Sequence, residues 1–220
     1  MMLGARTAAW VKSGEGLYRR ELSYVYTPNG EIGNDSWWFD AGFTYSDMFG
    51  FEINLIRLID TTSDQAAFGS RNNNVANDSR FFVGCYGSMY YWGWNTLKTV
   101  GGITVGKQYR QGLNYLNSRT MTLDGAVIES GLATHVNMSS SRVYFPVYAP
   151  NGVSSMRPSS SRTKYYAIGE CKMSIGYDIV ADYIPVELND GTITFYDKIT
   201  EKVMVKSSYA RAELREYNAS

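Results

Sequence analysis

The sequence is poor in the residues that metal centres, disulfide scaffolds and histidine-dependent enzymes require. Its 220 residues include one histidine, His135, and two cysteines, Cys85 and Cys171. One histidine excludes a multi-histidine metal site, and two cysteines in unrelated surroundings match neither a disulfide scaffold nor a zinc motif. We therefore expect no metal and no cofactor, and we interpret His135 as an exposed loop residue. We expect the cysteines to be buried free thiols, with one disulfide between them as the alternative.

Charge of one sign and long apolar runs are also missing. The 21 basic residues cancel the 21 acidic ones, and no run of Lys or Arg could form a phosphate-binding stripe, so we expect no nucleic-acid partner. No apolar stretch approaches the roughly 20 residues needed to cross a bilayer, so we expect no membrane partner. The beginning of the sequence, MMLGARTAAWVKSGEG, lacks the apolar core of a secretory signal. A protein of this kind that works outside the cell would need another route, such as release within a virus particle.

What the chain does contain favours β-structure. It has 18 tyrosines and 21 glycines, and Ser, Thr and Asn are plentiful. Aromatic and β-branched residues favour strands, and Gly, Asn and Ser favour the turns between them. More than a dozen short strand-like runs recur at regular spacing, which is typical of a sandwich or barrel. We predict an all-β protein of two packed antiparallel sheets, with a short helix over 209–217 as the one helical candidate.

Several local predictions are specific enough to test. Leu17–Thr27 is predicted to be one strand, and 48–60 one long strand. Asp124-Gly125 between two short apolar runs is the strongest hairpin signal in the chain. A second hairpin turns at 189–191. Pro185, just before it, should lie at a sheet edge or a strand end, because proline cannot donate to a β-ladder.

Four motifs occur in an order that resembles a known family. They are Phe39-Asp40-Ala41-Gly42, Phe68-Gly69-Ser70-Arg71, Leu123-Asp124-Gly125, and a closing segment from Asp182-Tyr183-Ile184-Pro185-Val186 to Asp197-Lys198. In this order they resemble LamG-like jelly-roll modules of the concanavalin A-like lectin/glucanase superfamily. Such modules occur in phage virion proteins and in surface proteins of gut bacteria. The likeness covers about residues 36–206.

The resemblance implies a two-sheet antiparallel jelly-roll sandwich and a division of the chain into three parts. Residues 1–35 would be a lead-in strand and docking segment, 36–206 the jelly roll, and 207–220 a polar tail. It also implies a structural or adhesive component of a phage virion: a head fibre, a capsid decoration or a tail appendage. The expected partners are other virion proteins, further copies of the chain and a host surface polysaccharide, and the expected location is the virion or the extracellular space.

The sequence offers little support for catalysis. Hydrolases on this jelly roll carry paired carboxylates at alternate positions of one strand, so that an acid and a nucleophile face the scissile bond together. No Glu-x-Asp-x-Glu pattern or relaxed form of it occurs, and no Ser or Cys has the local surroundings of a nucleophile. We therefore predict a protein that is not an enzyme. An unusual glycan hydrolase is the third hypothesis, after the virion component and the binding module described next.

The candidate ligand site is an aromatic run with an asparagine-rich loop. Tyr90, Trp92 and Trp94 alternate along a predicted strand and would project from one side of it, where three rings could stack on sugars. Their alternative role is to fill the core or a subunit interface. Asn72, Asn73 and Asn74 could add polar contacts to a glycan, could bind calcium, or could form a solvated turn. The second hypothesis is thus a carbohydrate-binding module of a bacterial surface protein.

Overall fold

The computed structural model describes residues 16–28, 37–46, 48–59, 65–72, 80–86, 89–94, 98–114, 119–131, 142–146, 148–151 and 166–218. For parts of these ranges, mainly in β5 to β8 and β13, the backbone alone is described. Every regular element in the described chain is a β-strand, which confirms the all-β prediction. The described part of the chain contains no helix that could span a membrane.

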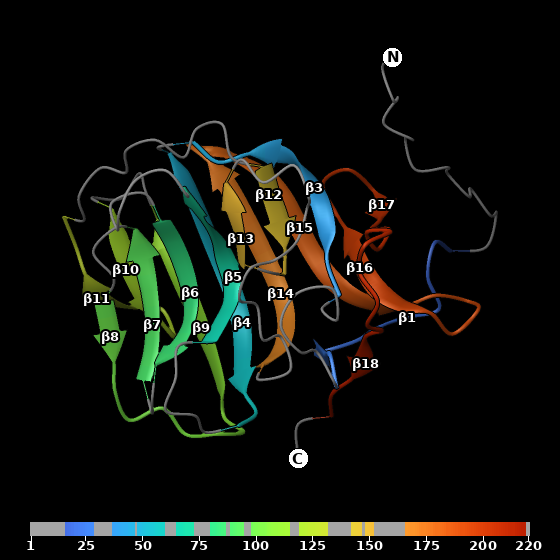
Figure 1. Ribbon diagram of the computed structural model, residues 1–220, viewed down its shortest axis with the longest axis horizontal. Helices are drawn as coiled ribbons and strands as arrows, with labels where there is room; N and C mark the ends of the chain where they lie inside the picture. The colour runs from blue at the N-terminus through green and yellow to red at the C-terminus, as the bar shows by residue number, and fades with distance from the viewer. Residues whose placement is uncertain are drawn as a thin grey trace.

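The larger layer is an 11-stranded sheet. Its main path runs, in spatial order, through β11 (Ala126–Glu129), β10 (Thr120–Leu123), β9 (Gln108–Asn114), β4 (Phe49–Arg57), β14 (Tyr166–Ile175), β15 (Asp178–Glu187), β16 (Ile193–Asp197) and β17 (Lys202–Val203). Three short strands complete it: β1 (Arg20–Glu21), β2 (Val25–Tyr26) and β18 (Arg215–Glu216). β1 pairs with β15, and β2 pairs with both β14 and β18. Figure 1 shows β1 and β18 on the opposite side of the molecule from β11.

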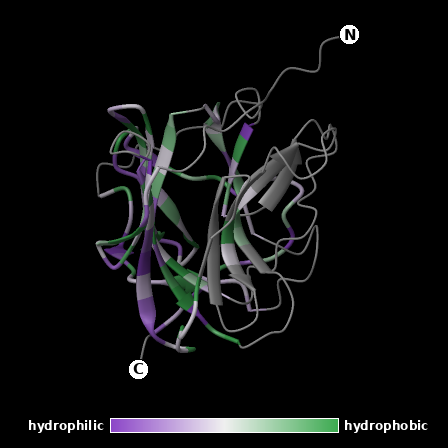
Figure 2. Cartoon of the chain, turned by 90° about the vertical axis from the view of Figure 1, so that its left-hand side faces the viewer, coloured by the Kyte–Doolittle hydropathy of each residue, from purple (hydrophilic) through white to green (hydrophobic). Residues whose placement is uncertain are grey.

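The second layer consists of two smaller sheets. One follows the order β13 (Tyr148–Asn151), β5 (Gln65–Asn72), β6 (Arg80–Tyr86), β7 (Met89–Trp94) and β8 (Lys98–Val100). The other pairs β12 (Arg142–Phe145) with β3 (Phe39–Thr44). Figure 2 shows the two layers side by side. The predicted two-layer sandwich is therefore confirmed, with one departure from the antiparallel prediction: β13 and β5 are parallel.

Aromatic rings from both layers fill the core between them. Phe68 of β5 lies 6.2 Å from Phe51 of β4, measured between ring centroids. Phe145 of β12 stacks on Tyr183 of β15 at 5.4 Å. All four side chains are almost completely buried, and burial of one such ring stabilises the fold by about 1.5–3 kcal/mol. This packing fixes one face of the large sheet as the core face and leaves its opposite face free to build a site.

Local turn chemistry follows the predictions closely. Asp124 and Gly125 have φ angles of 51° and 81°, the two positive values that a tight type I′ hairpin requires. In the closing hairpin, Asp190 accepts a hydrogen bond from the Thr192 amide at 2.8 Å. Asp197 accepts hydrogen bonds from the amides of Asp182 and Ile199. These carboxylates therefore shape turns, as we expected from their short side chains.

The prediction of one strand over Leu17–Thr27 is wrong. The segment forms two strands, β1 and β2, because its two halves pair with different partners. β1 pairs with β15 and β2 pairs with β14, and these two partners have separated at this point. The residues between β1 and β2 cross from one partner to the other.

The predicted helix over 209–217 is also wrong. A turn at 208–209 is followed by extended chain and by β18, which pairs with β2 through Arg215 opposite Tyr26. Weak local helix propensity gives way to this long-range pairing. The divisions at residues 35 and 206 stay a prediction, but parts of both flanking segments are strands of the large sheet.

Pro185 lies inside β15, which corrects its predicted place at an edge or strand end. The backbone bonds from Lys198 N to Asp182 O and from Leu188 N to Thr192 O show that even-numbered residues of β15 bond to β16. Pro185 therefore faces the opposite side, by the alternation of an antiparallel ladder. There β14 has turned away, and the Pro185 carbonyl accepts a bond from Leu22 N at 2.9 Å. Pro185, which has no N–H to donate, thus lies where β14 and β15 no longer pair with each other.

Candidate functional site

The structure tests the predicted aromatic site only at the level of the backbone. Tyr90, Trp92 and Trp94 lie on β7, as predicted, and Asn72 is the last residue of β5. Their side chains, and the whole of Asn73, Asn74 and His135, lie outside the described residues. The register places Trp92 opposite Val83, which is buried in the core. The role of this run, as sugar platform or as core, stays a prediction.

The described residues build a different site on the outer face of the large sheet, the face turned away from the second layer. On β4, Phe51, Ile53 and Leu55 belong to the core, while Glu52 and Asn54 alternate with them on the outer side. The same alternation holds on the neighbouring strands. The outer face therefore carries polar side chains around Glu52 and Asn54, whereas further along β4 the outer-side Ile56 is buried in a small apolar cluster with Ala167 and Tyr24.

Four charged residues form a row across this face, here called the charged row: Glu52, Lys172, Asp182 and Lys198. Lys172 of β14 lies directly opposite Glu52 of β4 on one side and Asp182 of β15 on the other. Lys198, just beyond β16, donates its backbone N–H to the Asp182 carbonyl. Opposite charges thus alternate across neighbouring strands, an arrangement in which each cross-strand pair contributes roughly 0.2–1 kcal/mol.

Ion pairs neutralise the charges along this row. Glu52 is paired with Arg110 of β9. The Lys172 ammonium lies 3.3 Å from Glu170 and 3.9 Å from Asp182, and Lys198 lies 3.9 Å from Glu170. The side chains of Lys172 and Glu170 are 38% and 32% exposed, so solvent screens this pair only in part. Every charged group of the row has an opposite charge within reach.

Asp182 is the most perturbed acid of the row. Its side chain is 14% exposed, and its Oδ1 atom is buried without a hydrogen-bond partner. Burial is the main cause that raises the pKa of this carboxyl, and the nearby Glu170 raises it further. Lys172 and Lys198 act in the opposite direction without cancelling the effect.

The sheet divides beside this row, at a β-bulge in β14. Ile168 pairs with Leu55 and Cys171 pairs with Ile53, so Gly169 and Glu170 together face one residue of β4. Gly169 is tightly packed: a Cβ there would lie 2.9 Å from both the Ser23 carbonyl oxygen and the Tyr24 ring. The chain from β1 to β2 can therefore cross the sheet at this point only because residue 169 has no side chain.

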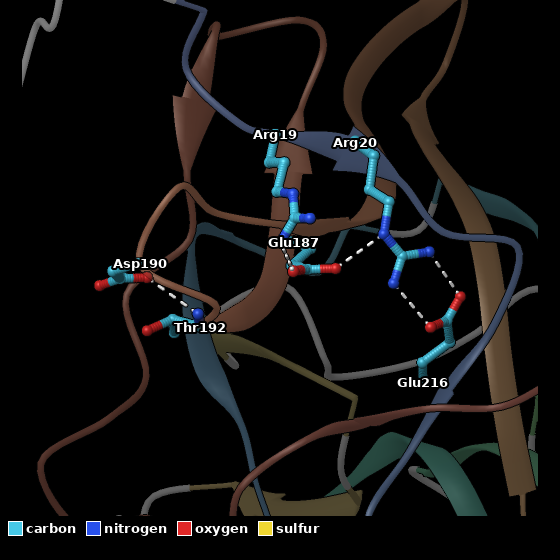
Figure 3. Close-up of polar contacts among 6 residues, drawn as sticks. All are labelled: Arg19, Arg20, Glu187, Asp190, Thr192 and Glu216. Carbon is cyan, nitrogen blue, oxygen red and sulfur yellow. Dashed lines mark hydrogen bonds and ion pairs between the residues drawn. The ribbon is translucent and has the colours of Figure 1, made fainter.

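Both ends of the described chain are tied together at this division by four residues, here called the terminal clasp: Arg19, Arg20, Glu187 and Glu216 (Figure 3). Arg20 donates from Nε to Glu187 at 2.7 Å and from both terminal nitrogens to Glu216, each at 2.7 Å. Arg19 adds a contact to Glu187 at 3.0 Å. The hydrogen bonds from Arg20 lower the pKa of Glu216. The clasp holds β1, β15 and β18 in one unit.

Two clefts open on the outer face, one on each side of the Lys172–Glu170 pair. The first, here called the sheet cleft, has a volume of about 540 Å³. Its lining includes Glu52, Gly112 and Lys172. Hydroxyl and amide side chains from neighbouring strands complete its polar part. Three exposed apolar or aromatic side chains also line it: Tyr177 at 89% exposure, Val127 at 60% and Ile179 at 51%.

The second cleft, here called the terminal cleft, lies where the sheet divides and has a volume of about 530 Å³. Residues from both chain ends line it together with outer-face residues of the sheet: Glu21, Leu22, Ser23, Tyr24, Asn54, Gln108, Glu170, Ile184, Pro185, Lys198, Glu216, Tyr217 and Asn218. Burial raises the pKa of Tyr24 to about 12, so its hydroxyl stays protonated at neutral pH. The cleft combines two tyrosines with several amide and carboxylate groups.

These clefts are suited to bind a polar ligand that also has apolar faces. Among the described residues, no three His, Cys, Asp or Glu side chains gather as a metal site. Cys171 is buried and forms no disulfide, which confirms the free-thiol prediction for that residue.

The outer face was not predicted from the sequence, because its residues come from separate strands. The available signal was the alternation of polar residues along 48–60 and 170–184.

Comparison with known proteins identifies the fold. No family model matches the sequence, and no curated protein matches it. Among solved structures, the chain is similar to a protein of Bacteroides ovatus described as a "putative carbohydrate binding protein", with a TM-score of 0.51 and 10% sequence identity. The match covers 91% of this chain and 61% of that one, so the present chain spans less than two thirds of its length. At this identity, the likeness shows a shared all-β sandwich.

Proposed function

We propose that the protein is a non-enzymatic, glycan-binding β-sandwich and that the sheet cleft holds the sugar. The observation that carries this proposal is the make-up of that cleft. Tyr177, Val127 and Ile179 are exposed beside the polar groups Glu52 and Lys172. A sugar ring has apolar C–H faces and a rim of hydroxyls, so it needs both kinds of surface at once.

The electrostatics of the cleft agree with a binding role. Glu52 is engaged by Arg110, and Lys172 is engaged by Glu170 and Asp182. A carboxylate held in place by a guanidinium can also accept hydrogen bonds from the hydroxyls of a ligand. The similarity in fold to a structure described as a "putative carbohydrate binding protein" supports the same role.

The test is binding of the full chain to an array of neutral and acidic glycans, followed by titration of the best ligand. Tyr177→Ala should weaken binding roughly two- to tenfold, the loss expected for an aromatic contact of about 0.5–1.5 kcal/mol. Tyr209→Ala is the matched control, because Tyr209 is 53% exposed and lines neither cleft. Absence of binding to every glycan, or equal losses in both variants, would contradict the proposal.

The setting of this binding activity is a separate proposal that rests on the motif resemblance. The resemblance supports a structural or adhesive part of a phage virion that assembles with other virion proteins and with copies of itself, and that binds host polysaccharide outside the cell. Co-sedimentation with purified virions and light scattering of the isolated chain test it. A strictly monomeric chain that does not associate with virions would contradict it.

A further inference from the structure

The two clefts are neighbours on one face and share a strand. Lys172 lines the sheet cleft and Glu170 lines the terminal cleft, and both project from the outer side of β14. Their side chains meet at 3.3 Å. On β14 this ion pair therefore lies between the two clefts, and both of its side chains are partly exposed, at 38% for Lys172 and 32% for Glu170.

We propose that the outer face binds an uncharged linear polysaccharide that runs along β14 and occupies both clefts. This inference rests on the proposed function, because it takes glycan binding in the sheet cleft as its starting point. It adds the class of ligand: an internal stretch of a chain, and not a single terminal sugar. The terminal cleft becomes a second part of the same site.

The dimensions of the face fit such a ligand. Ser174 in the sheet cleft and Glu170 in the terminal cleft are four residues apart on β14, which corresponds to about 13 Å along a strand. With volumes of about 540 and 530 Å³, each cleft falls within the usual range for a small-molecule site, roughly 300–1,000 Å³. One monosaccharide is too small to occupy both clefts, whereas an extended oligosaccharide can.

The lining of the terminal cleft repeats the chemistry of the sheet cleft. Tyr217 is partly exposed and supplies an aromatic ring, and Asn54 and Gln108 supply amide donors and acceptors. Tyr217 is held in place by its ring contact with Tyr26 at 6.1 Å and by the bond from its amide to the Tyr24 carbonyl. Both clefts therefore present a tyrosine beside hydrogen-bonding groups.

The charge pattern at the divide favours an uncharged chain. Glu170 is paired with Lys172 and Lys198, and Lys172 is also paired with Asp182. An anionic chain crossing here would compete with the carboxylates for the lysines, and a cationic chain would compete with the lysines for the carboxylates. A chain of hydroxyls can bond to both without separating them.

The experiment is a titration with neutral cello-, xylo-, manno- and laminari-oligosaccharides, each as a disaccharide and as a hexasaccharide. For the series that binds, the hexasaccharide should bind at least about tenfold more tightly. Tyr177→Ala should weaken binding of both lengths. Tyr217→Ala and Gln108→Ala should each weaken the hexasaccharide several-fold and leave the disaccharide unchanged, with Tyr209→Ala as the control. Circular dichroism establishes that each variant is folded.

The outcomes separate the two proposals. Binding that depends on Tyr177 but has equal affinity for both lengths, or no response to either terminal-cleft variant, overturns the inference and leaves the proposed function intact. Failure of every oligosaccharide to bind overturns both. Tighter binding of an anionic hexasaccharide, tested with oligogalacturonate, overturns the assignment of an uncharged chain.

Discussion

Lys172 and Glu170 lie two residues apart on β14, and their side chains meet at 3.3 Å on the outer face of the large sheet. Between them is Cys171, which points into the core. The inner residues of β14 thus pack in the core of the sandwich, and its outer residues Lys172 and Glu170 lie between the two clefts. Changes on the two sides of β14 should therefore have separable effects on stability and on binding.

Gly169 is predicted to be essential for the crossing of the terminal segment. In Gly169→Ala the new methyl group would lie 2.9 Å from the Ser23 carbonyl oxygen and 3.1 Å from the Asn54 Cβ atom. Backbone must move to relieve these contacts, so we expect a loss of about 1–3 kcal/mol in unfolding free energy, measured by urea denaturation. Gly16→Ala is the control, because its nearest contact is 3.6 Å away. Equal stability of the two variants would contradict the prediction.

The terminal clasp is predicted to depend on Arg20 much more than on Arg19. Arg20 bridges Glu187 and Glu216, whereas the Arg19 side chain contacts Glu187 and is 64% exposed. Arg20→Gln should therefore speed hydrogen exchange of the Tyr217 amide, which bonds to Tyr24. Arg19→Gln should change this exchange little. Similar exchange rates in both variants, measured by mass spectrometry at low salt, would count against the clasp.

Features of the fold that depend on neighbouring residues could be predicted from the sequence. The hairpin at Asp124-Gly125 needs only two residues with positive φ, and the faces of β4 follow from alternation along one strand. In both cases the physical cause lies within a few consecutive residues. The all-β class follows from many such local signals added together.

The candidate site could not be predicted in this way, because pairing between distant segments creates it. Lys172 faces Glu52 and Asp182 only through the registers of β14 with β4 and β15. The bulge at Gly169 shifts that register by one residue, and no local pattern in the sequence marks it. The pairing of β18 with β2 likewise overrides the local preference of the tail for helix.

Cys171 is predicted to be chemically inert in the folded protein. It is completely buried on the core side of β14, and burial raises the pKa of its thiol well above the ordinary value. Because the thiolate is the reactive form, iodoacetamide at about pH 8 should leave Cys171 unlabelled in the native protein and label it rapidly in urea. A Cys85→Ser background isolates the signal. Labelling of the native protein at the rate of an exposed thiol would show that the strand opens.

Asp182 is predicted to reduce stability as the pH rises. Its folded pKa is raised, chiefly by burial, so the folded state favours the protonated form more than the unfolded chain does. Its favourable contribution is therefore complete below the unfolded pKa and is lost as the pH rises through the folded pKa. The difference in unfolding free energy between Asp182→Asn and the wild type should then increase in favour of the variant from about pH 3 to about pH 7.

Asp190 provides a control of opposite sign in the same measurement. The Thr192 amide, which donates to Asp190 at 2.8 Å, lowers the pKa of this carboxyl. Its contribution is present above the unfolded pKa and lost as the pH falls through the folded pKa, so Asp190→Asn should lose stability relative to the wild type as the pH rises. If Asp182→Asn also lost stability relative to the wild type as the pH rises, the folded pKa of Asp182 would be lowered and not raised. The ion pairs with Lys172 and Lys198 would then outweigh burial at the divide between the clefts.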